Sequence, residues 1–344
     1  MPAFLNLLIA VFGFAISAGL TRRFCDPASR LHILDHPNER SLHTRPTPRS
    51  GGIAILGAVC VGTLWLAWRF QDTSRLPWIA AGMLLIAAVS FVDDRRRLPV
   101  AERMLAHLLS AALLLWRGFV LHGLTVGGAV LDFPGWLGIV LSLLFVVWMV
   151  NLYNFMDGMD GFAGGMAVIG FGGFAILGWM AGNELFFATS ALVAAAAAGF
   201  LFYNFPPARI FMGDAGSSAL GFLAAALTLW GMRAGIFRFA TALLVFSPFV
   251  VDATVTLFRR LLQGEKIWQA HRTHYYQRLV QLGWGHRKTV LWEYVLMLAC
   301  AASAIWASSR AQAVQGVVLI VWGMLYVSLI VLVHVFERRA RQSV

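Results

Sequence analysis

The stretch Gly135–Gly161, GWLGIVLSLLFVVWMVNLYNFMDGMDG, joins a long apolar run to a group of amides and carboxylates. Residues 135–153 carry no charge, and a bilayer core requires about 20 apolar residues per helix. The polar side chains that follow are spaced three residues apart: Asn151, Asn154, Asp157 and Asp160. Neighbouring pairs share a helix face, and such groups are costly to desolvate without partners. The stretch therefore predicts a membrane-spanning helix with a functional site at its end.

The whole chain has the composition of a membrane protein. Hydrophobic residues make up 59% of its 344 residues and charged residues only 12%, against about 25% charged in soluble proteins. Eleven apolar spans are predicted, near residues 3–21, 51–70, 77–92, 101–120, 135–153, 163–182, 185–203, 216–231, 235–258, 289–309 and 312–335. Backbone groups in lipid must be paired within their own segment, so these spans should be helices. We predict an all-α polytopic fold, with residues 1–344 forming a single membrane domain.

The distribution of charge predicts the orientation. The first apolar run has no Lys or Arg before it and Arg22-Arg23 after it, which predicts a retained helix with its N-terminus outside. Eleven spans then place the C-terminus in the cytosol. All but six of the 27 Lys and Arg residues fall in the predicted cytosolic segments; the six are Arg69, Arg75, Arg117, Arg233, Arg238 and Arg310. The net charge of +11 thus follows the positive-inside rule and predicts no nucleic-acid partner. Leu124–Pro134, with its Gly-Gly, predicts a short exterior β-hairpin.

Aspartates gather in three of the predicted cytosolic loops. Asp93 and Asp94 end the third span, and adjacent carboxylates favour a bound Mg²⁺ or a raised pKa on one of them. The alternative is a solvated helix end that Arg95–Arg97 neutralises. Asp214, in FMGDAGSS, fits either a helix cap or a metal ligand. Together with Asp157, these loops suit Mg²⁺, which uses a few carboxylates, waters and substrate phosphates.

Two basic loops lie on the same predicted face. They are His36–Gly52 (HPNERSLHTRPTPRSGG) and His271–Arg278 (HRTHYYQR). Arginine and histidine clusters favour phosphate oxygens, although the positive-inside rule alone also enriches such loops in basic residues. Asp252 lies inside the ninth span, where a carboxylate is a functional candidate or a partner for Arg259.

The order of these motifs resembles the polyprenyl-phosphate N-acetylhexosamine-1-phosphate transferases. The resemblance to this superfamily, glycosyltransferase family 4, covers nearly the whole chain. It is carried by NERSLHTRPTPRSGG, FVDDRRRLP, the NxxDGxDG stretch, FMGDAGSS and the late His-rich loop. The late loop reads HRTHYYQ and departs from the triple-histidine form of the phospho-MurNAc-pentapeptide transferases. The chain therefore resembles the O-antigen-initiating branch more than the related peptidoglycan branch.

The resemblance implies roles for individual residues. Asp93, Asp94 and Asp157 would be catalytic, and Asp214 with Asn154 would hold Mg²⁺, with Mn²⁺ as a substitute. The implied substrate-binding residues are Arg45, Thr47, Arg49, Arg97, Asn151, Asp160, His271, Arg272 and His274. Arg97 stands where the family often has lysine, which keeps the charge but changes the geometry.

The implied reaction moves a sugar 1-phosphate onto a membrane lipid. The donor would be a UDP-N-acetylhexosamine or deoxy-amino sugar, the acceptor undecaprenyl phosphate, and the leaving group UMP, initiating a glycan such as O-antigen. The implied location is multi-pass in the bacterial cytoplasmic membrane, and a homodimer is common in the family. One alternative is the phospho-MurNAc-pentapeptide reaction. Another is a transporter or flippase, which predicts mid-membrane charges and paired repeats with broken helices.

Overall fold

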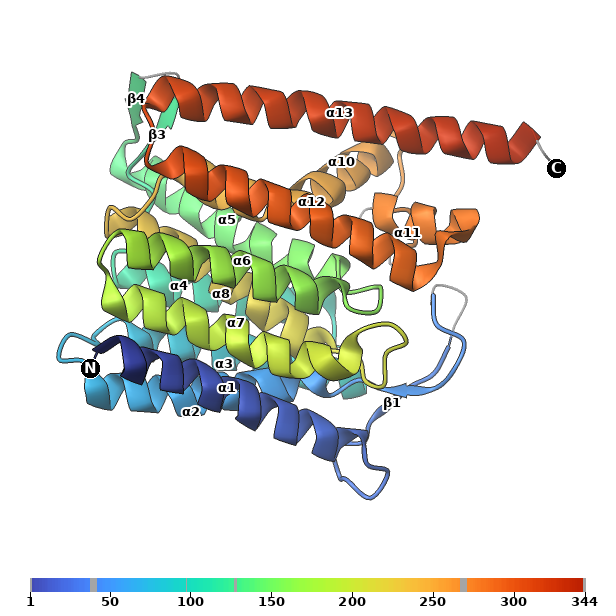
Figure 1. Ribbon diagram of the computed structural model, residues 1–344, viewed down its shortest axis with the longest axis horizontal. Helices are drawn as coiled ribbons and strands as arrows, with labels where there is room; N and C mark the ends of the chain where they lie inside the picture. Colours follow the sequence, from blue (N-terminus) through green and yellow to red (C-terminus); the bar gives the residue numbers. More distant parts are fainter. Residues whose placement is uncertain (1, 38–41, 97, 127–128, 267–270, 343–344) are drawn as a thin grey trace.

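The computed structural model describes residues 2–37, 42–96, 98–126, 129–266 and 271–342, and these residues form a helical bundle (Figure 1). The helices are α1 (Pro2–Cys25), α2 (Gly51–Arg69), α3 (Leu76–Arg96), α4 (Val100–Trp116), α5 (Gly135–Phe155), α6 (Phe162–Met180), α7 (Glu184–Asn204), α8 (Asp214–Arg233), α9 (Phe239–Val245), α10 (Ser247–Leu262), α11 (Tyr275–Leu279), α12 (Gly285–Ser308) and α13 (Gln312–Gln342). A π-helical turn, Val280–Trp284, joins α11 to α12. The predicted all-α polytopic fold is confirmed.

Most of the predicted spans correspond to single helices. Within the described ranges, nine helices are long and apolar enough to cross a membrane. Of the two remaining predicted spans, the one at 101–120 corresponds to α4, which has 17 residues and ends at Trp116. The predicted span over 235–258 is not one continuous helix, because α9 and α10 meet at an angle of 83°. Pro248 explains a new helix start here, since proline has no amide to continue the hydrogen bonds of α9.

The centre of the bundle is α8, which is buried along nearly its whole length. It packs closely against α3 and α5. It also meets α2 at a pair of glycines: a Cβ atom on Gly52 would lie 2.3 Å from the Cα of Gly216. Such small residues allow membrane helices to approach at the backbone. The start of α8, which carries Asp214, is thereby fixed against the start of α2.

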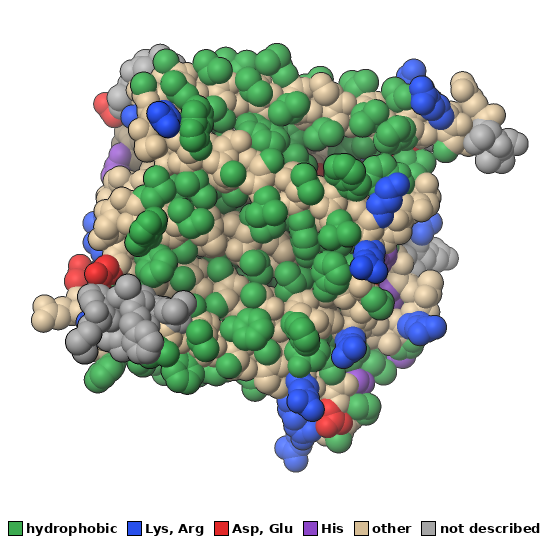
Figure 2. Space-filling model, in the orientation of Figure 1, with side chains coloured by type: hydrophobic (Ala, Val, Ile, Leu, Met, Phe, Trp, Pro, Cys, Tyr) green, Lys and Arg blue, Asp and Glu red, His purple; other side chains and the backbone are tan. Residues whose placement is uncertain are grey.

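The two ends of the bundle differ in what they carry (Figure 1). The N-terminus lies at one end with β3 (Gly123–Val126) and β4 (Ala129–Asp132), the antiparallel pair that confirms the predicted hairpin. The other end carries β1 (Leu34–Asp35), which pairs with β2 (Thr47–Pro48), and the aspartate-bearing ends of α3, α5 and α8. Figure 2 shows a broad hydrophobic face, with Lys and Arg concentrated toward the β1 end. The side of the membrane that each end faces stays a prediction.

Candidate active site

Backbone hydrogen bonds join the first loop to the segment before α8. The Phe211 amide donates to the Pro48 carbonyl at 2.6 Å, and the Gly51 amide donates to the Phe211 carbonyl at 2.9 Å. Gly213 has φ +77°, and a Cβ atom there would lie 2.3 Å from the Arg49 carbonyl oxygen. Only glycine fits this turn without strain. The consequence is that the side chains of Arg49 and Asp214 are delivered to one place.

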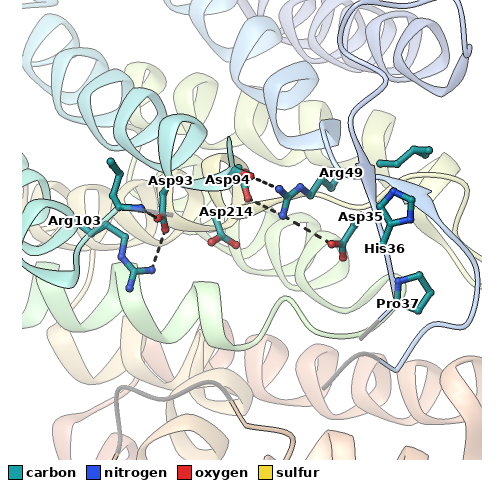
Figure 3. Close-up of a pocket in the computed structure, with 10 residues that line it drawn as sticks. Asp35, His36, Pro37, Arg49, Asp93, Asp94, Arg103 and Asp214 are labelled. Carbon is teal, nitrogen blue, oxygen red and sulfur yellow. Dashed lines mark hydrogen bonds and ion pairs between the residues drawn. The ribbon is translucent and has the colours of Figure 1, made fainter. Parts of the chain in front are cut away.

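A cavity of about 640 Å³ opens at this junction (Figure 3). Its polar lining comes from α3, α4, α8 and the first loop, and consists of Asp35, His36, Arg49, Asp93, Asp94, Arg103 and Asp214. The sequence separates these residues widely, yet the fold places them around one space. The cavity therefore combines carboxylates with two arginines.

The two adjacent aspartates of α3 have different surroundings. Asp93 accepts hydrogen bonds at both oxygens, from the Leu98 amide at 2.6 Å and from Nη1 of Arg103 at 3.0 Å. Asp94 faces Arg49, whose Nη1 lies 3.4 Å from its Oδ1 and whose guanidinium also donates to its backbone carbonyl. The saturated Asp93 is suited to holding the end of α3 in place. Asp94 also accepts a hydrogen bond from the Ala215 amide, and it lines both the larger cavity and its continuation.

A second, smaller cavity of about 190 Å³ continues from the first and shares Asp94 and Asp214 with it. It adds Asp157 and Asp160 from the loop between α5 and α6. Asp160 accepts from the Ala208 amide at 3.0 Å and lies 3.0 Å from Nδ1 of His286. Three carboxylates from separate segments, those of Asp94, Asp157 and Asp214, thus line one cavity.

The electrostatics of this cavity call for a cation. Burial raises the pKa of Asp157 well above its ordinary value, and the nearby carboxylates of Asp214 and Asp94 raise it further. No three His, Cys, Asp or Glu side chains of the described ranges form a ready-made metal cluster. Mg²⁺ does not require one, because it keeps several waters and takes oxygens from substrate phosphates. The carboxylate oxygens present here fit such an ion.

The amides predicted near the site hold its walls together. Nδ2 of Asn154 donates to Oγ of Ser217 at 3.0 Å, and its side chain also hydrogen-bonds Asp214. This links the end of α5 to the start of α8. Asn151 lies one turn earlier and donates to the Val147 carbonyl at 2.7 Å. Asn151 is not among the residues that line the two cavities.

Of the other predicted substrate-binding residues, Arg49 lines both cavities, whereas Arg45 and Thr47 line neither. Arg45 is exposed, and Thr47 is buried in β2 with its hydroxyl donating to the Arg45 carbonyl at 3.1 Å. Arg97 lies outside the described residues. The substrate contacts of all four residues stay predictions.

The late loop is organised by Asp252. Its Oδ1 lies 3.1 Å from Nδ1 of His274 and accepts the Tyr275 amide at 3.0 Å, while its Oδ2 accepts the Tyr276 amide at 3.0 Å. Asp252 therefore closes the N-terminus of α11 instead of pairing with Arg259. The turn it holds places the Tyr276 hydroxyl 3.3 Å from the Phe155 carbonyl, at the end of α5.

Three predicted substrate-binding residues lie on this loop and do not line the two cavities: His271, Arg272 and His274. Burial, together with the charges of His274 and nearby arginines, lowers the pKa of His271 to about 3. His271 is therefore neutral, while Arg272 is exposed. Their contact with substrate stays a prediction.

Three ionisable residues of the site were not predicted: Asp35, Arg103 and His286. Asp35 lies 3.9 Å from Nη1 of Arg49, and the other two hold Asp93 and Asp160. One of the three could have been found from the sequence, because Arg103 is a basic residue that follows soon after the aspartate pair. His286 lies in a segment that the sequence analysis treated only as part of a basic loop, without a role in the site.

Comparisons with known proteins identify the family of the chain. A model of glycosyl transferase family 4 matches residues 76–232. The chain is 32% identical over 281 residues to a probable undecaprenyl-phosphate N-acetylglucosaminyl 1-phosphate transferase of Bacillus subtilis, covering 81% of this chain and 78% of the relative. It is 31% identical over 320 residues to a decaprenyl-phosphate N-acetylglucosaminephosphotransferase of Mycobacterium tuberculosis, covering 82% and 78%. It is 28% identical over 291 residues to a phospho-N-acetylmuramoyl-pentapeptide-transferase of Shouchella clausii, covering 80% and 84%. The chain therefore belongs to glycosyl transferase family 4, the polyprenyl-phosphate N-acetylhexosamine-1-phosphate transferases that its motifs resemble.

Proposed function

We propose that this protein transfers an N-acetylhexosamine 1-phosphate from a UDP-sugar to undecaprenyl phosphate and releases UMP. One observation carries the proposal: Asp94, Asp157 and Asp214 come from separate segments and line one cavity beside Arg49. That arrangement suits a diphosphate held through a cation, with arginine at its phosphate oxygens. The names of the relatives support the same reaction class.

The metal expected here is Mg²⁺, with Mn²⁺ as a substitute. Asp214 would hold it, supported by Asn154, and Asp94 and Asp157 line the same cavity. When bound, the ion supplies charge stabilisation to the diphosphate and to the departing phosphate. Its presence would also relieve the mutual repulsion that raises the pKa of Asp157.

The side chains of the site have different proposed roles. Arg49 is placed to bind phosphate oxygens and to offset charge that develops as the diphosphate breaks. Asp94, whose carboxylate lines both cavities beside Arg49, is the residue suited to orient the attacking lipid phosphate or to accept its proton. Asp93, held by Arg103, positions the end of α3. A direct attack and a two-step route through a phosphorylated aspartate both use these atoms.

The proposed donor is an N-acetylhexosamine nucleotide, and the proposed product initiates a surface glycan such as O-antigen in the cytoplasmic membrane, with the enzyme as a homodimer. The muramoyl-pentapeptide reaction is disfavoured by the late loop, which reads HRTHYYQ. A flippase is disfavoured because the carboxylates cluster at one end of the bundle. The described segments also contain one bent helix pair without a repeated counterpart.

The test is a transfer assay with purified protein. Radiolabelled UDP-N-acetylglucosamine, undecaprenyl phosphate and Mg²⁺ should give lipid-linked sugar and one UMP per sugar transferred, and EDTA should abolish the product. A panel with UDP-N-acetylgalactosamine and UDP-MurNAc-pentapeptide identifies the donor. Turnover of the pentapeptide alone would overturn the proposed donor. The absence of UMP release with every donor would overturn the reaction class.

A further inference from the structure

The outer face of the first turns of α12 carries a pocket that the transfer reaction does not use. Its volume is about 500 Å³. Six residues line it: Trp284, Arg287, Lys288, Leu291, Trp292 and Val295. The pocket is thus basic and aromatic toward the start of α12 and apolar further along the helix.

Helix geometry points this face away from the active site. His286 of the same turn lies 3.0 Å from Asp160 in the smaller cavity. At about 100° per residue, Arg287, Leu291 and Val295 lie roughly 100°, 140° and 180° around the helix from His286. A ligand in the outer pocket is therefore separated from Asp94 by the body of α12.

The two cations of the pocket are free to bind an anion. In the segments that the structure describes, neither Arg287 nor Lys288 forms an ion pair. Nζ of Lys288 lies 4.2 Å from the ring centre of Trp284, a cation–π contact that leaves its charge in place. The nearest carboxylate on α13, that of Glu337, is engaged by Arg278.

The order of the residues along α12 matches the layers of a membrane leaflet. Arg287 and Val295 are eight residues apart, which is about 12 Å along a helix. The headgroup layer is roughly 5–7 Å thick on each side of the hydrocarbon core. With the cations at headgroup level, Leu291 and Val295, which are 45% and 57% exposed, face acyl chains. Trp292, at 59% exposed, lies one residue past Leu291 on the same apolar side of the pocket.

We infer that this pocket binds the phosphate headgroup of an anionic two-chain phospholipid, with Arg287 and Lys288 on the phosphate and Leu291 and Val295 against the chains. Charge complementarity favours an anionic over a zwitterionic headgroup. The bulk phospholipid is the occupant, and not the lipid acceptor, because the pocket faces away from the carboxylates. The inference is independent of the proposed transferase activity.

Native mass spectrometry of the full-length protein in detergent tests the site. Dioleoylphosphatidylglycerol should bind more tightly than dioleoylphosphatidylcholine. Each cation near a headgroup contributes roughly fivefold, so R287Q/K288Q should weaken phosphatidylglycerol binding roughly 25-fold and leave phosphatidylcholine unchanged. The variant R287K/K288R keeps both charges and should keep most of the affinity.

A matched control removes two exposed arginines elsewhere at the same end of the bundle. R22Q/R30Q has the same change in net charge and should bind phosphatidylglycerol like the wild type. Equal losses in the two double variants would overturn the site in favour of diffuse charge attraction. Wild-type affinity in R287Q/K288Q would overturn it outright. Undecaprenyl phosphate that displaces phosphatidylglycerol from the wild type, and that R287Q/K288Q no longer binds, would overturn the assignment to phospholipid.

Discussion

A single carboxylate, Asp252, and a group of three carboxylates lie near the same end of the bundle, and their surroundings are opposite. Asp252 has both oxygens occupied by two backbone amides and His274, and Thr256 adds a further hydrogen bond at 3.0 Å. Asp94, Asp157 and Asp214 instead face one another across a cavity. Saturated oxygens indicate a structural carboxylate, whereas crowded and incompletely paired ones indicate a binding site.

The largest expected effect comes from neutralising the crowded group. Asp94→Asn and Asp214→Asn should each lower kcat by at least about 10²–10³-fold, the usual effect of removing one electrostatic contact in a preorganised site. Thermal stability should be unchanged or higher, because each change removes mutual repulsion. The transfer assay and a melting curve in detergent measure the two effects. An active Asp214→Asn variant would remove this residue from the metal site.

Neutralising Asp252 should lower stability and leave turnover nearly unchanged. Asp252→Asn leaves His274 and the N-terminus of α11 without their carboxylate, and breaking a buried pair costs about 3–5 kcal/mol. We expect a lower melting temperature and less folded protein, with near-normal turnover per folded molecule. Size-exclusion yield and the melting curve check the prediction. If Asp252→Asn folded normally but lost turnover, Asp252 would belong with the catalytic carboxylates.

Sequence reasoning could predict the elements more easily than their contacts. Long apolar runs predict helices, and the stretch that contains Gly-Gly predicted the β3–β4 hairpin, because both signals are local. The break between α9 and α10 was missed although Pro248 was visible, because proline is tolerated in membrane helices and hydropathy continues across it.

The site residues show the same difference: the residues in local motifs could be predicted, and the contacts between distant segments could not. Asp94, Asp157 and Asp214 stand in recognisable motifs, and the fold places them around one cavity. The pairing of Asp93 with Arg103 depends on how α4 returns against α3, and that of Asp160 with His286 depends on where α12 begins. Neither depends on local sequence. The saturation of Asp252 likewise becomes visible only once the fold brings α11 to it.

A smaller effect is expected from Arg103, which the structure makes a positioning residue. Arg103→Gln frees one oxygen of Asp93 and loosens the end of α3, so kcat should fall between about tenfold and a hundredfold, the cost of a slight misplacement. Arg103→Lys should restore part of the activity, with KM for the UDP-sugar little changed. Arg96→Gln, an exposed neighbour on the same helix end, is the control and should behave like the wild type. A change in KM alone would make Arg103 a substrate contact.

The smallest effect concerns pH. Because burial and the carboxylates of Asp214 and Asp94 raise the pKa of Asp157, this group holds a proton at pH values where an ordinary aspartate is ionised. A divalent cation needs the ionised form, so its binding must release the proton. The apparent Kd for Mn²⁺, measured by electron paramagnetic resonance of the free ion, should therefore fall as pH rises above the range in which an ordinary aspartate ionises. One released proton gives at most about a tenfold change per pH unit.

Asp157→Asn should flatten this dependence, whereas Asp252→Asn, which alters the saturated carboxylate, should leave it intact. Tighter Mn²⁺ binding at low pH would contradict the crowding of the three carboxylates.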